Sequence, residues 1–471
     1  MKPEMEKLAR EVFADMNIEI TSTGSCHLGA VIGSQEYKEE FIGKKVKELN
    51  EELNKLSKIG KTEPHAAYTA FTHGWKHKWI YISRTIPDIG ESLMPLENCI
   101  RNVFIPAISN GHICTDEERE ILALPPRLGG LGIPNPTKVA DQEYHNSLKI
   151  TANLKEKIIN QDRIVKNDVY EIKTIRREIS KARQLAQEEE LRNIIPRISE
   201  DMRLRLAMAQ EVGASNWLTA LPIKAKGFSL NKQEFTDALA LRHGWPVGGL
   251  PDLCACGSDF DEQHALTCQK GGFVSIRHDE VRNITHAMLK EVCRDVTLEP
   301  QLLPLQGEEF FYKTANTEQE ARVDVSARNF WIRGQQAFFD IRVFSPFARC
   351  YRQLSLGAAH LKNEREKERK YGERIRKVES GSFTPLVFTV GGGMSQQTKL
   401  FYRRIAELMA ERKDEPKGFF TAWLRCRLSF SLLKSAILCL RGTRSSKMHR
   451  EDLSTVDYED TAMKGRIAKT N

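Results

Sequence analysis

A cluster of cysteine and histidine residues near the middle of the chain constrains its fold more than any other feature. The segment CACGSDFDEQHALTC holds Cys254, Cys256, His264 and Cys268 within fifteen residues. Three thiolates and one imidazole are the ligand set of a closed tetrahedral zinc site, and because protein fills all four positions the predicted role is structural. A single residue between the first two cysteines is an unusual spacing, and Gly257 can supply the left-handed backbone that folds the chain back. The alternative is a set of buried free cysteines beside a solvent-facing histidine.

The composition is that of a water-soluble globular chain of two to four units. Hydrophobic residues make up 40% and charged residues 28% of 471 residues, which excludes collagen-like and low-complexity chains. The net charge of +8 is a weak indication of an anionic partner such as nucleic acid. Ten cysteines, scattered except for the central group, fit a reducing compartment better than a disulfide framework.

Neither a signal peptide nor a membrane span is expected. The first sixteen residues mix charges and lack an apolar core, so we expect a protein of the nucleus or cytoplasm that is not secreted. The apolar stretch from Phe419 to Leu440 is interrupted by Arg425, Arg427 and Lys434, and charges at mid-membrane are costly. We interpret this stretch as an amphipathic packing helix.

The expected fold is mainly α with an α/β module. Residues 18–34 mix β-branched residues with glycines and predict short strands with tight turns, and residues 37–59 predict an amphipathic helix. Residues 124–136 are dense in proline and glycine and predict a shaped loop, whereas 141–210 predict long exposed helices. A helix with Ser229 as its N-cap should end near Gly244. Residues 276–390 follow the order helix, strand, strand, charged helix, strand, and two more helices follow.

Two aspartates lie inside strongly β-forming runs of this α/β module. Asp324 stands in ARVDVSA and Asp340 in QAFFDIRVFSP, sixteen positions apart on strands that could pair. An aspartate is disfavoured in a strand, and a buried one must be paired or coordinate a cation. Oxygen ligands of this kind suit Mg²⁺. The alternative is two structural aspartates held by backbone donors or arginines.

The helices on either side add candidate site residues. RHDEVRNITHAMLKEV predicts an amphipathic helix with Glu280 near its first turn, where an acidic residue also suits the helix N-terminus. The charged helix of residues 360–379 can present Lys362 or Lys367 to the aspartates. Acid on a helix, two acids on neighbouring strands and a following lysine is the constellation of restriction-type nucleases, in which a metal ion acidifies water and the lysine stabilises charge on the phosphate. Arg342 can bind the phosphate but cannot act as a general base.

With these motifs the chain resembles the C-terminal region of non-LTR retrotransposon reverse-transcriptase polyproteins that carry a restriction-enzyme-like endonuclease. The resemblance covers about residues 18–445. GHICTDEEREILALPPRLGGLGIPNP is similar to the thumb that follows the polymerase palm, and GFSLNKQEFTDALALRHGWPVGGLPDLCACG followed by HALTCQKGGFVSIRHDEVRN is similar to the knuckle that precedes the nuclease. Val323 stands before Asp324 where the family often has proline, which weakens the motif without removing a ligand.

The resemblance implies a site and a set of partners. Cys254, Cys256, His264 and Cys268 would bind structural Zn²⁺, and Asp324 and Asp340 would bind catalytic Mg²⁺ or Mn²⁺. Lys367 and Glu280 would complete the catalytic group. Arg277, Arg342 and Lys362 are expected to bind nucleic acid. The partners would be DNA and element RNA, with no membrane and no small-molecule cofactor.

The expected organisation has seven segments. They are a palm remnant (1–35), a thumb-like helical region (36–150), a charged helical linker (151–235), a zinc knuckle (236–275), a restriction-like endonuclease with a mixed sheet flanked by helices (276–395), C-terminal helices (396–445) and a disordered tail (446–471).

The expected function is that of a metal-dependent endonuclease fragment that nicks target DNA and leaves a 3′-hydroxyl end. Reverse transcriptases hold Mg²⁺ with adjacent aspartates, and the sequence contains no Asp-Asp dipeptide, so we expect no polymerase activity. The alternative is a catalytically inactive, zinc-containing remnant of a decayed retrotransposon protein that binds nucleic acid.

Overall fold

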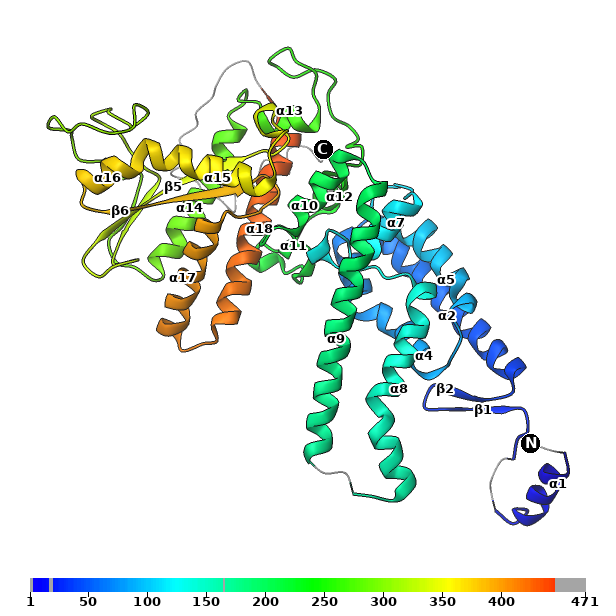
Figure 1. The fold of residues 1–471 in the computed structure, drawn as a ribbon. Coiled ribbons are helices and arrows are strands. Elements are labelled where there is room, and N and C mark those ends of the chain that lie inside the picture. Colours follow the sequence, from blue (N-terminus) through cyan, green and yellow to red (C-terminus); the bar gives the residue numbers. More distant parts are fainter. Residues whose placement is uncertain (1–2, 17–19, 164–165, 445–471) are drawn as a thin grey trace. The chain divides into compact units, whose positions relative to one another are not determined.

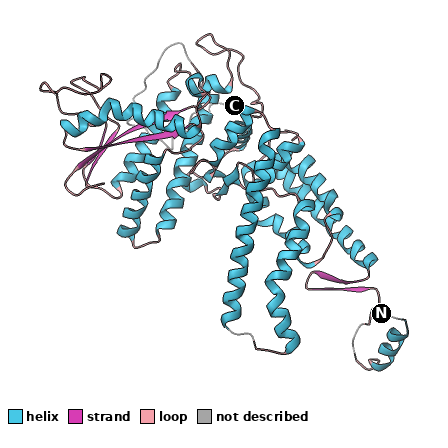
Figure 2. Cartoon of the chain, in the orientation of Figure 1, coloured by secondary structure: helices cyan, strands magenta, loops and turns pink. Residues whose placement is uncertain are grey.

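Helices dominate the part of the chain that the structure describes, and the strands of that part form two small sheets (Figures 1 and 2). The fold is that of a computed structural model, which describes residues 3–16, 20–163 and 166–444. It divides into two compact units, 1–125 with 130–198, and 126–129 with 199–471. The predicted tail from 446 onward lies outside the described residues.

The first unit contains a β-hairpin and a set of helices. β1 (Gly24–His27) pairs antiparallel with β2 (Ala30–Gly33), which confirms the prediction of short strands with a tight turn. The helices are α1 (Pro3–Val12), α2 (Gln35–Gly60), α3 (Pro64–Ala70), α4 (Lys76–Thr85), α5 (Met94–Cys99), α6 (Ile105–Ile108), α7 (Asp116–Ala123), α8 (Pro136–Asn160) and α9 (Lys166–Ile194). The apolar face predicted for α2 is buried at Ile42, Val46, Leu49 and Leu53. The long helices predicted from residue 141 are α8, α9 and, in the second unit, α10.

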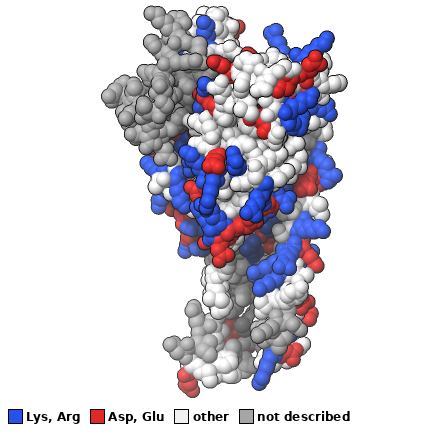
Figure 3. All heavy atoms as spheres, turned by 90° about the vertical axis from the view of Figure 1, so that its left-hand side faces the viewer, with Lys and Arg blue, Asp and Glu red and all other residues white. Residues whose placement is uncertain are grey.

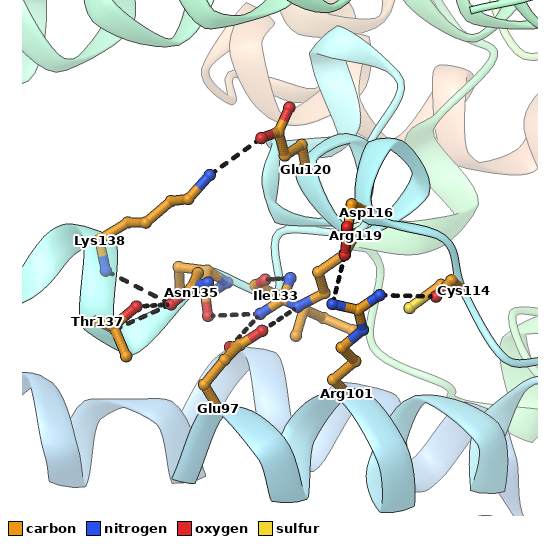
Figure 4. A network of polar contacts seen from close by, with 11 residues as sticks. Glu97, Arg101, Cys114, Asp116, Arg119, Glu120, Ile133, Asn135, Thr137 and Lys138 are labelled. Atoms are coloured by element: carbon orange, nitrogen blue, oxygen red, sulfur yellow. Dashed lines mark hydrogen bonds and ion pairs between the residues drawn. The ribbon is translucent and has the colours of Figure 1, made fainter. Parts of the chain in front are cut away.

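A buried ion pair in the first unit holds the later part of the proline- and glycine-rich loop, residues 130–136 (Figure 4). Arg119 on α7 forms two hydrogen bonds of 2.7 Å with the carboxylate of Glu97 on α5, and both side chains are less than 10% exposed. The same guanidinium donates to the carbonyl of Ile133 at 2.9 Å. Asn135 then caps α8 by accepting from the backbone N–H of Thr137 at 2.9 Å. The predicted shaped loop is therefore held to two helices by polar contacts.

The second unit holds the larger sheet, whose strand order is β3-β4-β5-β6. β3 (Val296–Leu298), β4 (Val325–Arg328) and β5 (Gln336–Phe344) pair antiparallel, and β6 (Ser382–Thr389) runs parallel to β5. The helices are α10 (Glu200–Gln210), α11 (Asn216–Thr219), α12 (Lys232–His243), α13 (Glu262–Thr267), α14 (Phe273–Lys290), α15 (Leu356–Lys367), α16 (Glu373–Lys377), α17 (Gln396–Lys413) and α18 (Lys417–Arg441). The predicted order of helix, strand, strand, charged helix and strand is confirmed, while β3 was not foreseen.

Helices cover both faces of this sheet (Figure 1). Val325, Phe339 and Leu386 point to the face that packs against α14, α17 and α18. Phe338 and Phe344 alternate with them and pack on the other face, against the α15–α16 segment. Because side chains alternate along a strand, residues of even number in β5 point toward α15.

Two expectations about helices are resolved in this unit. The N-cap of α12 is Asn231, not Ser229: Asn231 accepts from the backbone N–H of Glu234 at 2.9 Å, and the Glu234 carboxylate accepts from the N–H of Asn231. The stretch from Phe419 to Leu440 lies within α18, which packs under the sheet through Leu424, Leu428 and Leu432. Across the part of the chain that the structure describes, no helix has both the length and the apolar character needed to cross a membrane.

Candidate functional site

Four side chains of the cysteine-rich segment converge in the second unit. The ligand atoms of Cys254, Cys256, His264 and Cys268 all lie within 4.8 Å of one another. The two sulfur atoms of Cys254 and Cys268 are 3.7 Å apart, and Cys256 Sγ is 3.3 Å from His264 Nε2. Tetrahedral zinc with bonds of about 2.3 Å to sulfur and about 2.0 Å to nitrogen requires separations of about 3.8 and about 3.5 Å. The cluster can therefore hold a zinc ion.

Local backbone contacts shape residues 253–268. This is the part of the predicted zinc knuckle (236–275) that carries the four ligands, and from here on we call this part the knuckle. Gly257 has a φ of 87°, as the spacing of the first two cysteines predicted, and its N–H donates to the carbonyl of Cys254 at 2.8 Å. The backbone N–H of Cys254 donates to the carbonyl of Ser258 at 2.9 Å. Hydrogen bonds from the side chain and backbone of Ser258 lower the pKa of Cys256 to about 6. This favours the thiolate form that zinc requires.

Arg277 connects the knuckle to the rest of the unit and is not available to a phosphate. It is 2% exposed, donates to the carbonyl of Leu266 at 3.1 Å and lies 3.8 Å from the sulfur of Cys439 on α18. The expectation that Arg277 binds nucleic acid is therefore corrected: its guanidinium is a packing element. The sequence could not separate a buried arginine from an exposed one at the start of a helix.

The two aspartates of the α/β module lie opposite each other in the sheet. Val325 pairs with Phe339 in the antiparallel ladder of β4 and β5, so Asp324 precedes its strand directly across from Asp340. The expectation that these two runs pair is confirmed. Asp340 is 4% exposed, and as an even-numbered residue of β5 it points toward α15.

One lysine of the charged helix reaches these acids. Lys367, the last residue of α15, forms an ion pair with Asp340 Oδ2, and both side chains are largely buried. Asp324 Oδ2 accepts from the backbone N–H of Ile341 at 2.5 Å. A histidine that sequence reasoning missed completes the group: His278 Nε2 lies 3.2 Å from Asp324 Oδ2 and 3.2 Å from the carbonyl oxygen of Ile341. We call Asp324, Asp340, Lys367 and His278 the acid site.

The electrostatics of the acid site follow from burial and from these pairs. Burial raises the pKa of Asp340 even though Lys367 opposes the change. Burial also acts to raise the pKa of Asp324, but the hydrogen bond and charge of His278, the backbone N–H of Ile341 and the charge of Lys367 together outweigh burial, and the pKa falls below its ordinary value. Burial lowers the pKa of His278, yet hydrogen bonds to Asp279 and Asp324 outweigh burial and raise it to about 9. Asp324 therefore faces a positively charged His278, and Asp340 faces Lys367.

Glu280 does not join this group. Its carboxylate accepts a hydrogen bond of 2.9 Å from the hydroxyl of Ser431 on α18, on the opposite side of α14 from His278. Burial raises the pKa of Glu280 to about 7, although Ser431 and the nearby cations Lys434 and Arg427 oppose the change. The expectation that Glu280 completes the acid site is corrected, because residues two positions apart on a helix do not share a face.

Basic residues beside the acid site are exposed. Arg342 on β5 is exposed two positions after Asp340. Lys362 is also exposed; its Nζ lies 3.4 Å from the carbonyl of Cys350 and 5.3 Å from the ring centroid of Tyr351. Further exposed cations of the α15–α16 segment are Arg365, Arg369, Lys370, Arg376 and Lys377. Figure 3 faces the side of the molecule on which this segment lies and shows Lys and Arg side chains in groups, interspersed with Asp and Glu.

No profile of a known protein family matches the chain. No curated protein matches it either. What the fold and the sites define is a mostly helical protein with a small mixed sheet and a Cys/His cluster that can hold zinc.

Proposed function

We propose that the second unit is a metal-dependent endonuclease that nicks DNA. The observation that carries this proposal is the convergence of Asp324, Asp340 and Lys367, from two strands and the following helix, at one buried position. Three residues separated by up to 43 positions that meet in this way match the two acids and the lysine of restriction-type nucleases. The mixed sheet between α14 and α15 is the arrangement expected for such an enzyme.

The donor set of the acid site suits a divalent cation such as Mg²⁺ or Mn²⁺. Asp340 Oδ2 is buried and, among the described residues, has no hydrogen-bond partner beside its ion pair with Lys367. Asp324 Oδ2 already accepts from Ile341, which leaves Oδ1 of Asp324 to face a ligand. When bound, the cation would acidify a water molecule and neutralise charge on the scissile phosphate. Lys367 would hold negative charge that develops on the phosphate.

The exposed cations of the α15–α16 segment and Arg342 would bind the phosphate backbone. Such contacts position DNA without reading its sequence, and they weaken as salt rises because counterions are released from the DNA. The net charge of +8 supports an anionic partner. We further propose target DNA in the nucleus as the substrate, element RNA as a second partner, and a product with a 3′-hydroxyl end. Primer extension by the purified protein should be absent, and template-dependent synthesis would contradict this part of the proposal.

The test is nicking of supercoiled plasmid in Mg²⁺ or Mn²⁺ by the parent and by variants of equal zinc content. We expect Asp324→Ala, Asp340→Ala and Lys367→Ala each to lose about 100-fold or more in nicking rate, because each removes several kcal/mol of charge stabilisation. Lys362→Ala serves as the comparison on the same helix. It should retain the turnover rate and show only weaker DNA binding, whose affinity depends less on salt because one phosphate contact is lost. Nicking that survives in both aspartate variants would contradict the proposal.

A second candidate is the inactive remnant that binds zinc and nucleic acid. It is favoured by the pairing of each aspartate with a cation, Asp340 with Lys367 and Asp324 with His278, because buried carboxylates of purely structural role are also paired. If the parent and all variants are equally inert with either metal, this candidate replaces the endonuclease.

A further inference from the structure

We infer that His278 is a positioning residue of the acid site, which holds the Asp324 carboxylate in one orientation so that its second oxygen faces the catalytic cation. This inference rests on the proposed function and deepens it. It starts from a residue of α14 that lies far from both aspartates in the sequence and yet contacts one of them.

Every polar atom that contacts the imidazole of His278 is a hydrogen-bond acceptor. Nε2 lies 3.2 Å from Asp324 Oδ2 and 3.2 Å from the carbonyl oxygen of Ile341, while Nδ1 lies 3.3 Å from Asp279 Oδ1. A carboxylate and a carbonyl accept hydrogen bonds and cannot donate them, so Nε2 must carry the proton. Asp279 is held in turn by Arg282 at 3.0 Å, which fixes the other edge of the ring.

Two donors from two different elements therefore meet on one oxygen of Asp324. The backbone N–H of Ile341 arrives from β5 and the imidazole of His278 from α14. With Oδ2 engaged twice, the carboxylate cannot rotate without losing both bonds, and Oδ1 is the oxygen left for a cation. Because Nε2 is already committed as a donor, it cannot take a proton from water, which distinguishes positioning from general-base catalysis.

Outer contacts of this kind affect metal affinity. Residues that orient a metal ligand typically change affinity or activity by about 10- to 100-fold when they are removed. His278 also links α14 to the sheet beside the proposed cation position. Without His278, Asp324 could turn toward other donors.

The test measures Mn²⁺ binding by electron paramagnetic resonance in full-length, zinc-loaded protein, with Asp340→Asn to identify binding at the acid site. We expect His278→Ala to weaken that binding by about tenfold or more. His278→Gln, whose amide nitrogen can take the place of Nε2, should restore affinity to within about threefold of the parent. His278→Asn, whose amide takes the place of Nδ1, should not restore it. His286→Gln, two turns along the same helix, is the matched control and should bind like the parent.

The outcomes separate this inference from the proposed function. If Asp340→Asn abolishes Mn²⁺ binding while His278→Ala binds as tightly as the parent, the positioning role is overturned and the nuclease proposal stands. A ¹⁴N coupling to bound Mn²⁺ that disappears in His278→Gln would make His278 a direct ligand and also overturn positioning. If the parent binds no Mn²⁺ that depends on Asp340, the proposed function and the inference fall together.

Discussion

At the scale of single residues, the face of α14 on which a side chain lies decides whether it reaches the acid site. His278, Val281, Thr285 and Met288 follow the three- and four-residue spacing of one helix face, and this face meets the sheet and α17. Glu280, two positions after His278, turns to α18 instead. The choice of Glu280 as a site residue came from its chemistry, whereas the stripe of apolar neighbours would have selected His278.

The buried Glu280 predicts how stability changes with pH. Its pKa rises from an ordinary value of 4.5 to about 7 in the folded protein, so the folded state binds the proton more tightly than the unfolded state. Stability contributed by this proton is present below about pH 4.5 and is lost as the pH rises toward 7. Glutamine does not ionise, so Glu280→Gln does not lose this stability as the pH rises. We expect the variant to be more stable than the parent by about 2 kcal/mol at pH 8 and by less at pH 5.5.

Denaturant unfolding of both proteins at the two pH values measures this difference. Glu291→Gln, at the exposed end of the same helix, is the control and should show a difference of less than about 1 kcal/mol at either pH. If the stability difference between Glu280→Gln and the parent is no larger at pH 8 than at pH 5.5, the burial argument is contradicted. Full loss of metal-dependent nicking in that variant would return Glu280 to the acid site.

The candidate site could be predicted from the sequence only where chemistry and spacing suffice. The knuckle ligands stand within fifteen residues, and the two aspartates stand in β-forming runs whose pairing distance follows from the chain. His278 and the burial of Arg277 depend on which side of α14 faces the sheet and the knuckle, and that is decided by long-range packing.

At the scale of elements, strong local patterns identified the helices and strands, and weak ones did not. The apolar periodicity of α2 and the β-forming runs of β5 extend over many residues and were recognised. β3 has three residues and exists because it pairs with β4, so its sequence carries little signal of its own. The N-cap of α12 lies two residues after the serine chosen from sequence, because Asn231 and Glu234 form a capping box.

The ion pair between Arg119 and Glu97 gives a test of element packing in the first unit. Arg119→Ala would leave the carboxylate of Glu97 buried without its partner and release the carbonyl of Ile133. Removing one partner of a buried pair typically costs about 3 to 5 kcal/mol, so we expect a loss of this size in the free energy of unfolding. Chemical denaturation followed by tryptophan fluorescence would measure it.

The comparison variant lies in the same view (Figure 4). Arg101 pairs with Asp116 at 2.6 Å, but the Asp116 side chain is 81% exposed. Arg101→Ala should therefore cost about 1 kcal/mol or less. Equal losses in the two variants would show that burial does not decide the strength of these pairs.

At the scale of the whole molecule, packing divides the chain more coarsely than composition does. The sequence predicts seven segments, whereas the structure has two compact units that separate between residues 198 and 199, within the predicted linker 151–235. The C-terminal helices α17 and α18 belong to the core under the sheet because Phe401, Leu424 and Leu428 are buried there. Changes in composition mark helices and loops, but only tertiary contacts show which of them share a core.

Two arginines, the buried Arg205 and the half-buried Arg444, link the knuckle to the rest of the second unit, so we expect a zinc ion bound there to stabilise that unit. Arg205 on α10 forms hydrogen bonds of 2.9 and 3.0 Å with the carboxylate of Glu262 on α13. Arg444 lies 4.6 Å from the ring centroid of Phe260 and donates to the carbonyl of Ala265 at 3.0 Å. A knuckle that opens would lose these contacts and take from the buried Arg205 its bidentate partner Glu262.

We therefore expect the purified protein to carry about one zinc per chain, and its removal to loosen particular elements. After chelation, or in Cys256→Ser, hydrogen exchange should accelerate in α13, in the start of α14 and in the end of α18, because the knuckle contacts all three. Cys293→Ser, at a half-buried cysteine outside the cluster, is the control, and helices α2 to α5 of the first unit are the internal reference.

Metal analysis that finds no zinc after purification without chelator, or exchange that is unchanged when zinc is removed, would contradict a structural zinc site. Faster exchange that extended to the reference helices would instead mean that zinc stabilises more than the unit that binds it.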